Sequence, residues 1–359
     1  MSFVRLSKCA LILVTGSILI QAISAAPQTK PYVAQQVTEN NIPVIRLVDS
    51  VRGVEVSVVP SLGNRAYEMK MHGKNILHFP YADLAEFQKK PGLNSIPFLA
   101  PWANRIDGTG FYANGKKYEF NLGLGNVSKT GLPMHGLLSA SGLWKVTEVA
   151  ADARSAHVTS KLEFWRNPAL MAQWPFAHEY EMTYRLADGM LEVNVVITNL
   201  SSEAMPVAVG FHPYFRIPDI PRDEWTLRMP ACKAVVADER RIPTGEFKPC
   251  DLPNPLPLQG RTLDNGFTDL ERGADGRARF AIESSGKTVE VFFGPKYLVA
   301  VIWEPAAPAG QTREFVCIEP MASVTNGINM GHAGTYPDLQ TIPAGGKWSE
   351  SFWIRAAGF

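Results

Sequence analysis

The clearest structural signal in the chain is the stretch Glu179-Tyr-Glu-Met-Thr-Tyr-Arg-Leu-Ala-Asp-Gly-Met-Leu-Glu-Val-Asn-Val-Val-Ile-Thr198. Apolar and polar residues alternate on both sides of Asp188-Gly189, which is the pattern of two half-buried strands. Asp-Gly favours the tight turn of a β-hairpin, because both residues adopt a positive φ easily. The stretch therefore predicts an antiparallel hairpin with strands over 179–186 and 191–198.

Other alternating runs extend this pattern along the chain: Val54–Val59, His157–Phe164, Val289–Phe293, Tyr297–Trp303 and Trp348–Ile354. Alternation buries one face of each strand, as in antiparallel sheets stacked in pairs. The 29 glycines and 27 prolines disfavour long helices. We therefore predict a single all-β domain, a large antiparallel β-sandwich. The exceptions are a short helix over 81–90 and a surface loop over 249–257.

Composition excludes several classes of protein. With 46% hydrophobic and 19% charged residues, the chain is neither disordered nor a polytopic membrane protein. The 35 basic residues are balanced by 34 acidic ones, so the basic excess of a nucleic-acid-binding protein is missing. No C-x-x-C motif or Cys/His cluster occurs, which argues against a structural zinc site. We predict no nucleic-acid partner and no metal.

The first 25 residues have the features of a secretory signal peptide. Arg5 and Lys8 precede an apolar stretch, and small residues follow that stretch at 24–26. We expect cleavage after Ala25 and export to the periplasm or the medium, with no membrane attachment afterwards. An uncleaved N-terminal anchor is the alternative.

The remaining chain divides, on this interpretation, into an N-terminal extension over 26–43 and one domain over 44–357. Cys232 and Cys250 either form a disulfide in an oxidising compartment or remain two thiols, with Cys317 unpaired. The sequence leaves these two alternatives open.

Titratable residues stand at the ends of apolar runs in three places. These are Ala100–Ile106 together with Pro133–Gly136, then Val209–Phe215, and finally Val316–Pro320 leading into Thr325–Asn329. At each place a strand is expected to stop beside Pro or Gly, so the side chain faces a cleft while the strand holds it. Glu319 stands out, since burying a carboxylate is costly unless it is paired, solvated or used. Taken singly, each residue is also explained as a hydrogen-bonded or ion-paired structural group.

Four motifs together resemble the aldose 1-epimerase (galactose mutarotase) family. They are Asn104-Arg-Ile106, His135-Gly136, Gly210-Phe-His-Pro-Tyr-Phe215 and Ile318-Glu-Pro320, in this order along the chain. The resemblance covers roughly residues 44–355 and implies an antiparallel β-supersandwich of the galactose mutarotase type. The Gly-Phe-His-Pro-Tyr-Phe form is more similar to the branch that includes glucose-6-phosphate 1-epimerases.

The resemblance implies an enzyme, an isomerase that interconverts the α and β anomers of a free aldohexose. Ring opening needs a base for the O1 hydroxyl proton and an acid for the ring oxygen, and these proton transfers need no cofactor. By position, Glu319 matches the base and His212 the acid. The sugar-binding residues implied are His135, Arg105, Asn104 and Asp264. Trp102 or Trp303 could stack on the sugar, although packing in the core explains them equally.

Two alternatives remain open, one of them not an enzyme. A carbohydrate-binding protein would use the same groove without needing a base or an acid. A hexose-6-phosphate 1-epimerase would need converging cations, for which Arg65, Lys70 and Lys74 are candidates. Export favours a free sugar, since hexose phosphates are mainly cytosolic, and a polysaccharide hydrolase would call for paired carboxylates. The sequence leaves the identity of the sugar and the oligomeric state open.

Overall fold

The computed structural model describes residues 1–3, 31–123, 127–306 and 313–359, apart from the side chain of Cys232. One compact unit comprises Pro31–Phe359. The proposed signal peptide lies, except for its first three residues, outside the described residues. None of the helices in the described part of the chain has the length and hydropathy needed to span a bilayer.

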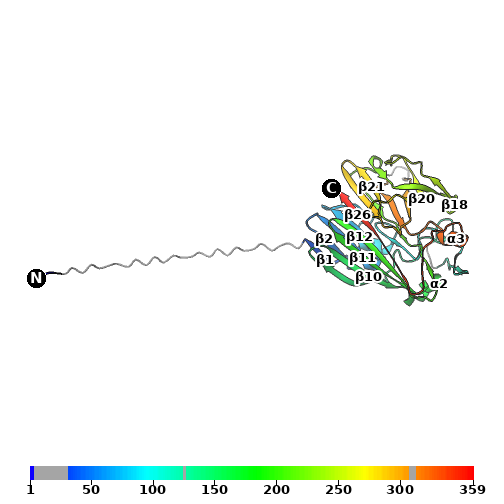
Figure 1. Ribbon diagram of the computed structural model, residues 1–359, viewed down its shortest axis with the longest axis horizontal. Helices are drawn as coiled ribbons and strands as arrows, with labels where there is room; N and C mark the ends of the chain where they lie inside the picture. Colours follow the sequence, from blue (N-terminus) through cyan, green and yellow to red (C-terminus); the bar gives the residue numbers. More distant parts are fainter. Residues whose placement is uncertain (4–30, 124–126, 307–312) are drawn as a thin grey trace. The chain divides into compact units, whose positions relative to one another are not determined.

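The largest sheet has nine strands, and its neighbouring strands are antiparallel (Figure 1). In sheet order they are β19 (Leu256–Pro257), β16 (Thr226–Arg228), β21 (Ala278–Ser284), β22 (Lys287–Phe293), β26 (Lys347–Ala357), β12 (Met190–Asn199), β11 (His178–Ala187), β10 (Ala156–Glu163) and β9 (Lys145–Ala151). Strands β11 and β12 form the predicted hairpin, with Asp188 at φ 51° and Gly189 at φ 71° in the turn. Both turn residues have the positive φ that the Asp-Gly pair favours.

A second sheet of eight strands contains Asp264 and Glu319, two of the residues predicted for the site. Its order is β18 (Pro243–Pro249), β17 (Ala231–Ala237), β20 (Leu263–Leu270), β23 (Val299–Glu304), β24 (Val316–Met321), β14 (Gly210–Phe211) and β6 (Phe98–Leu99), with β15 (Tyr214–Phe215) also paired to β24. Two short two-stranded sheets pair β7 (Gly110–Ala113) with β8 (Lys116–Glu119), and β13 (Met205–Pro206) with β25 (Thr341–Ile342).

The β-sheet structure begins at Tyr32, earlier than residue 44, where the sequence predicts the start of the domain. A five-stranded sheet runs in the order β1 (Tyr32–Glu39), β2 (Ile42–Asp49), β3 (Val54–Val59), β4 (Arg65–Met71) and β5 (Lys74–Asn75). Strand β1 pairs with β2 along its whole length, so residues 32–43 belong to this sheet and not to a separate extension. The sequence signal is weak because β1 is a polar edge strand whose middle residues, Gln35 and Gln36, are exposed.

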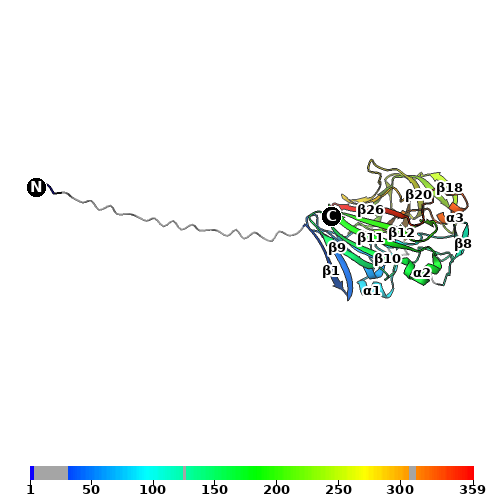
Figure 2. The ribbon, with the colours of Figure 1, turned by 60° about the horizontal axis from the view of Figure 1, so that its bottom comes forward.

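Helices are short and few in the described chain: α1 (Leu84–Lys89), α2 (Pro168–Gln173), α3 (Gly327–His332) and 3₁₀ turns at Pro60–Leu62, Phe164–Arg166 and Arg222–Glu224. Helix α1 lies within the predicted 81–90 segment and begins where the Asp83 side chain accepts a hydrogen bond from the Glu86 N–H. Its Phe87 belongs to the same buried hydrophobic cluster as Ile42 and Val59 of the five-stranded sheet. Figure 2 shows α1 at the lower edge of the domain.

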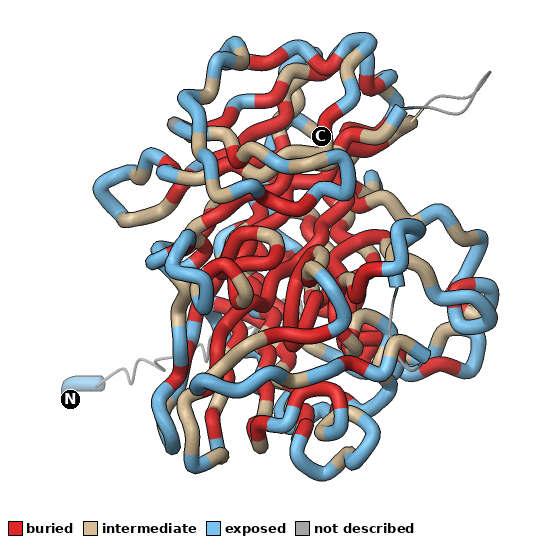
Figure 3. Tube along the Cα trace, turned by 90° about the vertical axis from the view of Figure 1, so that its right-hand side faces the viewer, coloured by how far each residue is buried: buried red, intermediate tan, exposed pale blue. Residues whose placement is uncertain are grey.

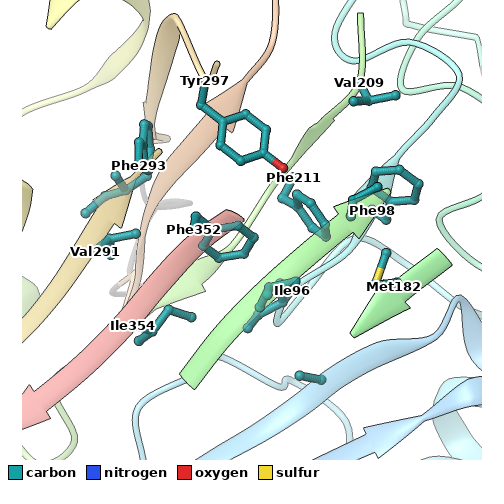
Figure 4. Close-up of a cluster of buried hydrophobic side chains, with 14 of the residues drawn as sticks. Ile96, Phe98, Met182, Val209, Phe211, Val291, Phe293, Tyr297, Phe352 and Ile354 are labelled. Carbon is teal, nitrogen blue, oxygen red and sulfur yellow. The ribbon is translucent and has the colours of Figure 1, made fainter. Parts of the chain in front are cut away.

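The two large sheets face each other across the main core. Phe211 of β14 packs on Phe352 of β26, with ring centroids 4.9 Å apart, and Figure 4 shows both rings among their buried neighbours. Phe98 of β6 packs on Tyr180 of β11, with ring centroids 5.4 Å apart. Buried residues occupy the interior strands, and exposed ones gather at the connecting loops (Figure 3). The prediction of an all-β antiparallel sandwich is confirmed.

The two cysteine side chains that the structure describes in the domain form no disulfide. Cys250 and Cys317 are free thiols, and Cys317 is fully buried in β24. The predicted surface loop over 249–257 is shorter in the structure. Residues 250–255 form a loop that connects β18 to β19, and the two ends of the predicted segment belong to these strands.

Candidate functional site

The site is built on the inner strands of the eight-stranded sheet. Val301 of β23 lies opposite Glu319 of β24 on one side and Gly266 of β20 on the other. Residues directly opposite in a sheet share a face, as do residues two apart in one strand. Glu319 and Asp264 therefore lie on the same face, two strands apart.

His212 reaches Glu319 because the neighbouring strand is broken. Gly210 of β14 pairs with Met321, and Tyr214 of β15 pairs with Cys317, so the interruption at His212-Pro213 falls opposite Glu319. The Nε2 atom of His212 lies 3.2 Å from Oε1 of Glu319. Both residues are buried, with 5% and 1% of their surface exposed. The predicted acid and base are thus in direct contact.

Aromatic rings fix the orientation of the His212 imidazole. Tyr214 stacks on it at 4.8 Å with an interplanar angle of 15°, and Trp303 meets it edge-on at 5.5 Å. His135 approaches from another side, also at 5.5 Å and nearly perpendicular. Trp303 therefore borders the histidine, whereas Trp102 packs in the core against Phe120 and Trp174.

Strained loops bring Asn104, Arg105 and His135 to the same place. Asn104 and His135 have φ values of 54° and 60°, and the His135 N–H donates to the Asn104 carbonyl at 2.9 Å. Asn326, at φ 58°, donates its N–H to the Arg105 carbonyl. Non-glycine residues at such angles cost energy and are concentrated at functional sites. The backbone on both sides of the Arg105 side chain is therefore held by hydrogen bonds.

A pocket lies beside the buried His212–Glu319 pair, since Val301 on its wall is paired in the sheet with Glu319. Three of the predicted residues line it: Asn104, Arg105 and Asp264. Gly266 and Val301 also line it. All six predicted residues thus gather at one place, three on the pocket wall and three buried next to it.

The electrostatics of the buried pair favour a state without net charge. Burial raises the pKa of Glu319 well above its usual value; the Asp264 charge adds to this rise and the Arg105 guanidinium opposes it. Burial also lowers the pKa of His212 well below its usual value, and His135 adds to that effect. The pKa of His135 itself falls to about 3 through burial, with a smaller contribution from Arg105. The lowered pKa of His212 disfavours binding of a second proton to the pair, and the raised pKa of Glu319 disfavours loss of the first.

The three cations considered for phosphate recognition are engaged elsewhere. Arg65 is fully buried and donates to the carbonyls of Gly92 and Ser139. Lys70 pairs with Glu68, and Lys74 with Asp219. None of the three lines the pocket.

One pocket residue was not anticipated from the sequence. Arg241, in the turn between β17 and β18, places its Nε 3.4 Å from Oδ2 of Asp264. The segment Asp238-Glu-Arg-Arg241 has the composition of an ordinary charged turn, so nothing in the sequence distinguishes Arg241. Among the described residues, no three His, Cys, Asp or Glu side chains gather as they would around a metal ion.

Comparison with known proteins gives consistent matches. The sequence profile of the aldose 1-epimerase family matches residues 47–355. The protein YphB of Escherichia coli is 24% identical over 265 residues, which cover 72% of this chain and 82% of YphB.

Solved structures agree in fold. A galactose mutarotase-like protein from Clostridium acetobutylicum superposes with a TM-score of 0.81 at 23% identity, covering 92% of this chain and 100% of that one. Galactose 1-epimerase from Lactobacillus acidophilus superposes with a TM-score of 0.67 at 14% identity, covering 91% and 99%.

Proposed function

The chain belongs to the aldose 1-epimerase family, and from this premise we propose that it interconverts the α and β anomers of a free aldohexose. The observation that carries the proposal is the His212–Glu319 contact of 3.2 Å, buried beside a polar pocket. A site that only bound sugars would not require an acid and a base in contact.

In the proposed reaction, the Glu319 carboxylate takes the proton from the O1 hydroxyl of the sugar. The C1–O5 bond breaks as O1 becomes a carbonyl oxygen, and His212 gives its proton to O5. Rotation about C1–C2 presents the other face of the aldehyde. Closure then returns both protons and yields the other anomer.

The proton count of the pair suits this cycle. Before ring opening Glu319 is a carboxylate and His212 an imidazolium; afterwards Glu319 is protonated and His212 is neutral. Both arrangements hold one proton and have no net charge. The pKa shifts of both residues favour the second arrangement, with Glu319 protonated and His212 neutral, so one proton crosses the 3.2 Å contact from Glu319 to His212 before ring opening.

The sugar-binding roles follow from position. We propose that Arg105 and Asp264 bind hydroxyl groups of the sugar, since both line the pocket and both charges act on Glu319. Asn104, also on the pocket wall, supports Arg105. His135, which lies against His212, is proposed to hold the region of C1 and the ring oxygen.

We propose a free sugar and not a phosphorylated one. Arg65, Lys70 and Lys74 are already paired and lie outside the pocket wall. The proposed export, based on Arg5, Lys8 and the apolar stretch behind them, supports the same choice, because an exported enzyme meets free sugars.

Polarimetry tests the proposal directly. Freshly dissolved α-glucose and α-galactose are followed with the purified protein and with the Glu319→Gln variant. Faster relaxation of the optical rotation with the native protein, lost in the variant, is the expected result. Acceleration with glucose 6-phosphate alone would contradict the free-sugar assignment. Sugar binding without acceleration would show a carbohydrate-binding protein.

A further inference from the structure

Arg241 occupies a backbone conformation that ordinarily favours glycine or asparagine. Its φ is 65°, in a turn closed by hydrogen bonds from the Asp238 N–H to the Ile242 carbonyl and from the Arg241 N–H to the Asp238 carbonyl. Most non-glycine residues with positive φ in the described chain are Asn, Asp or Ser; the exceptions are His72, His135 and Arg241. A long side chain at such a position is therefore unusual and suggests a role for that side chain.

The strained turn directs Arg241 into the pocket. The side chain lines the pocket wall, with Nε 3.4 Å from Oδ2 of Asp264 and a terminal nitrogen 3.5 Å from the Asp264 carbonyl oxygen. About half of the Arg241 side chain remains exposed, so donors remain for a ligand. Asp264 is the pocket carboxylate that also influences Glu319.

The neighbouring arginine points to a different partner. Arg240 donates to Asp107 at 2.8 Å and to Asp238 at 3.0 Å, and it does not line the pocket. One turn thus supplies two arginines: Arg240 binds the turn to the Asp107 loop, and Arg241 enters the pocket.

The sheet order places Arg241 on the side of the pocket away from the acid–base pair. Strands run β18, β17, β20, β23, β24, so the β17–β18 turn and Glu319 are separated by β20 and β23. Neighbouring strands are about 4.8 Å apart, which puts β20 and β24 about 10 Å from each other. A sugar whose C1 meets Glu319 therefore presents its far hydroxyl groups to Asp264 and Arg241.

We infer that Arg241 is a sugar-binding residue that holds Asp264 in place and donates to hydroxyl groups remote from the anomeric carbon. This inference rests on the proposed function and adds a specificity-determining residue to it. The Arg241–Asp264 pair is neutral overall and offers both donors and acceptors, which suits an uncharged polyol edge.

Paired variants of the turn test the inference. Arg241→Gly removes the side chain and relieves the backbone, whereas Arg240→Ala removes a guanidinium from the same turn outside the pocket. Polarimetry gives kcat and KM with α-glucose and α-galactose, calorimetric titration with both sugars gives Kd, and thermal unfolding gives Tm.

For Arg241→Gly we expect KM and Kd to rise about tenfold, kcat to change less than twofold, and Tm to stay equal or increase. Arg240→Ala should change KM less than twofold. A native-like KM in Arg241→Gly, or an equal KM increase in both variants, would overturn the inference while leaving the proposed function intact. A native protein that neither binds nor converts either sugar would overturn both.

Discussion

The two large sheets are both antiparallel, but they differ in how regularly buried and exposed positions alternate along their strands. In the nine-stranded sheet, β11 and β12 are ten residues long, with buried positions alternating with more exposed ones in unbroken register. In the eight-stranded sheet, all six residues of β24 are buried, and its partner is broken into the two-residue strands β14 and β15. Regular alternation builds the core; the break admits an imidazole next to a buried carboxylate.

Two buried histidines make the contrast specific. His178 of β11 stacks on Phe164 at 4.2 Å, and its Nδ1 lies 2.6 Å from the Phe176 carbonyl oxygen. His212 has a carboxylate as its partner instead. Burial lowers the pKa of both rings, so burial alone does not distinguish the proposed acid from a structural histidine. The two rings differ in their partners, a carbonyl oxygen for His178 and a carboxylate for His212.

The largest expected effect is that of Glu319→Gln on turnover. The amide keeps the shape of the side chain and removes the base, so kcat should fall about 10³-fold with little change in Tm. Glu304→Gln is the matched control, since Glu304 is equally buried on the neighbouring strand β23 and pairs with Arg222. Its kcat should stay within about threefold of the native value; equal losses in both variants would remove the distinction between the two carboxylates.

Substitution of the two histidines by asparagine should separate catalysis from packing. His212→Asn is expected to lower kcat about 10²-fold and to move the acid limb of its pH profile to higher pH. That direction follows because the variant lacks the imidazolium, 3.2 Å from Glu319, whose positive charge stabilises the Glu319 carboxylate. His178→Asn should instead cost about 2 kcal/mol of stability and leave kcat nearly unchanged. Loss of turnover in His178→Asn at native stability would contradict this division.

Arg105→Ala should act on binding more than on chemistry. Arg105 lines the pocket, and its contacts with sugar hydroxyls exist before ring opening, so KM should rise about tenfold while kcat falls less. Steady-state polarimetry at several sugar concentrations separates the two constants. A large fall in kcat at unchanged KM would show instead that Arg105 acts on the transition state.

The smallest effect concerns stability in acid. The folded-state pKa of His178 is lowered to about 4, below its value of about 6.5 in the unfolded chain. At this one residue the unfolded state therefore binds more protons between these values, so the contribution of His178 to stability falls as pH drops below about 6.5, by up to roughly 1.4 kcal/mol per pH unit. His78 and His135, whose pKa values are lowered to about 4 and about 3, add losses of the same sign. Denaturant titrations at pH 7 and 5.5 measure the loss. The His178→Asn variant should lose less over the same interval, and an equal loss would assign the effect to other groups.

The strands that the sequence predicted correctly are those that local alternation of apolar and polar residues specifies. The hairpin of β11 and β12 and the strand Val54–Val59 follow from alternation and turn residues, which are properties of neighbouring positions. The six site residues came from motifs resembling the family, and the structure brings them together. Arg241 escaped prediction because its role depends on Asp264, which lies 23 positions away and is reached only through sheet pairing.

The position of β26 in the nine-stranded sheet has a consequence for how the polypeptide matures. This strand, the last in the chain, lies between β22 and β12, and it alone joins the β19–β22 portion to the β12–β9 portion. The sheet stays in two pieces until residues 347–357 have left the ribosome. Truncation by a dozen residues would therefore divide the sandwich at its centre and expose two unpaired strand edges, a state prone to aggregation.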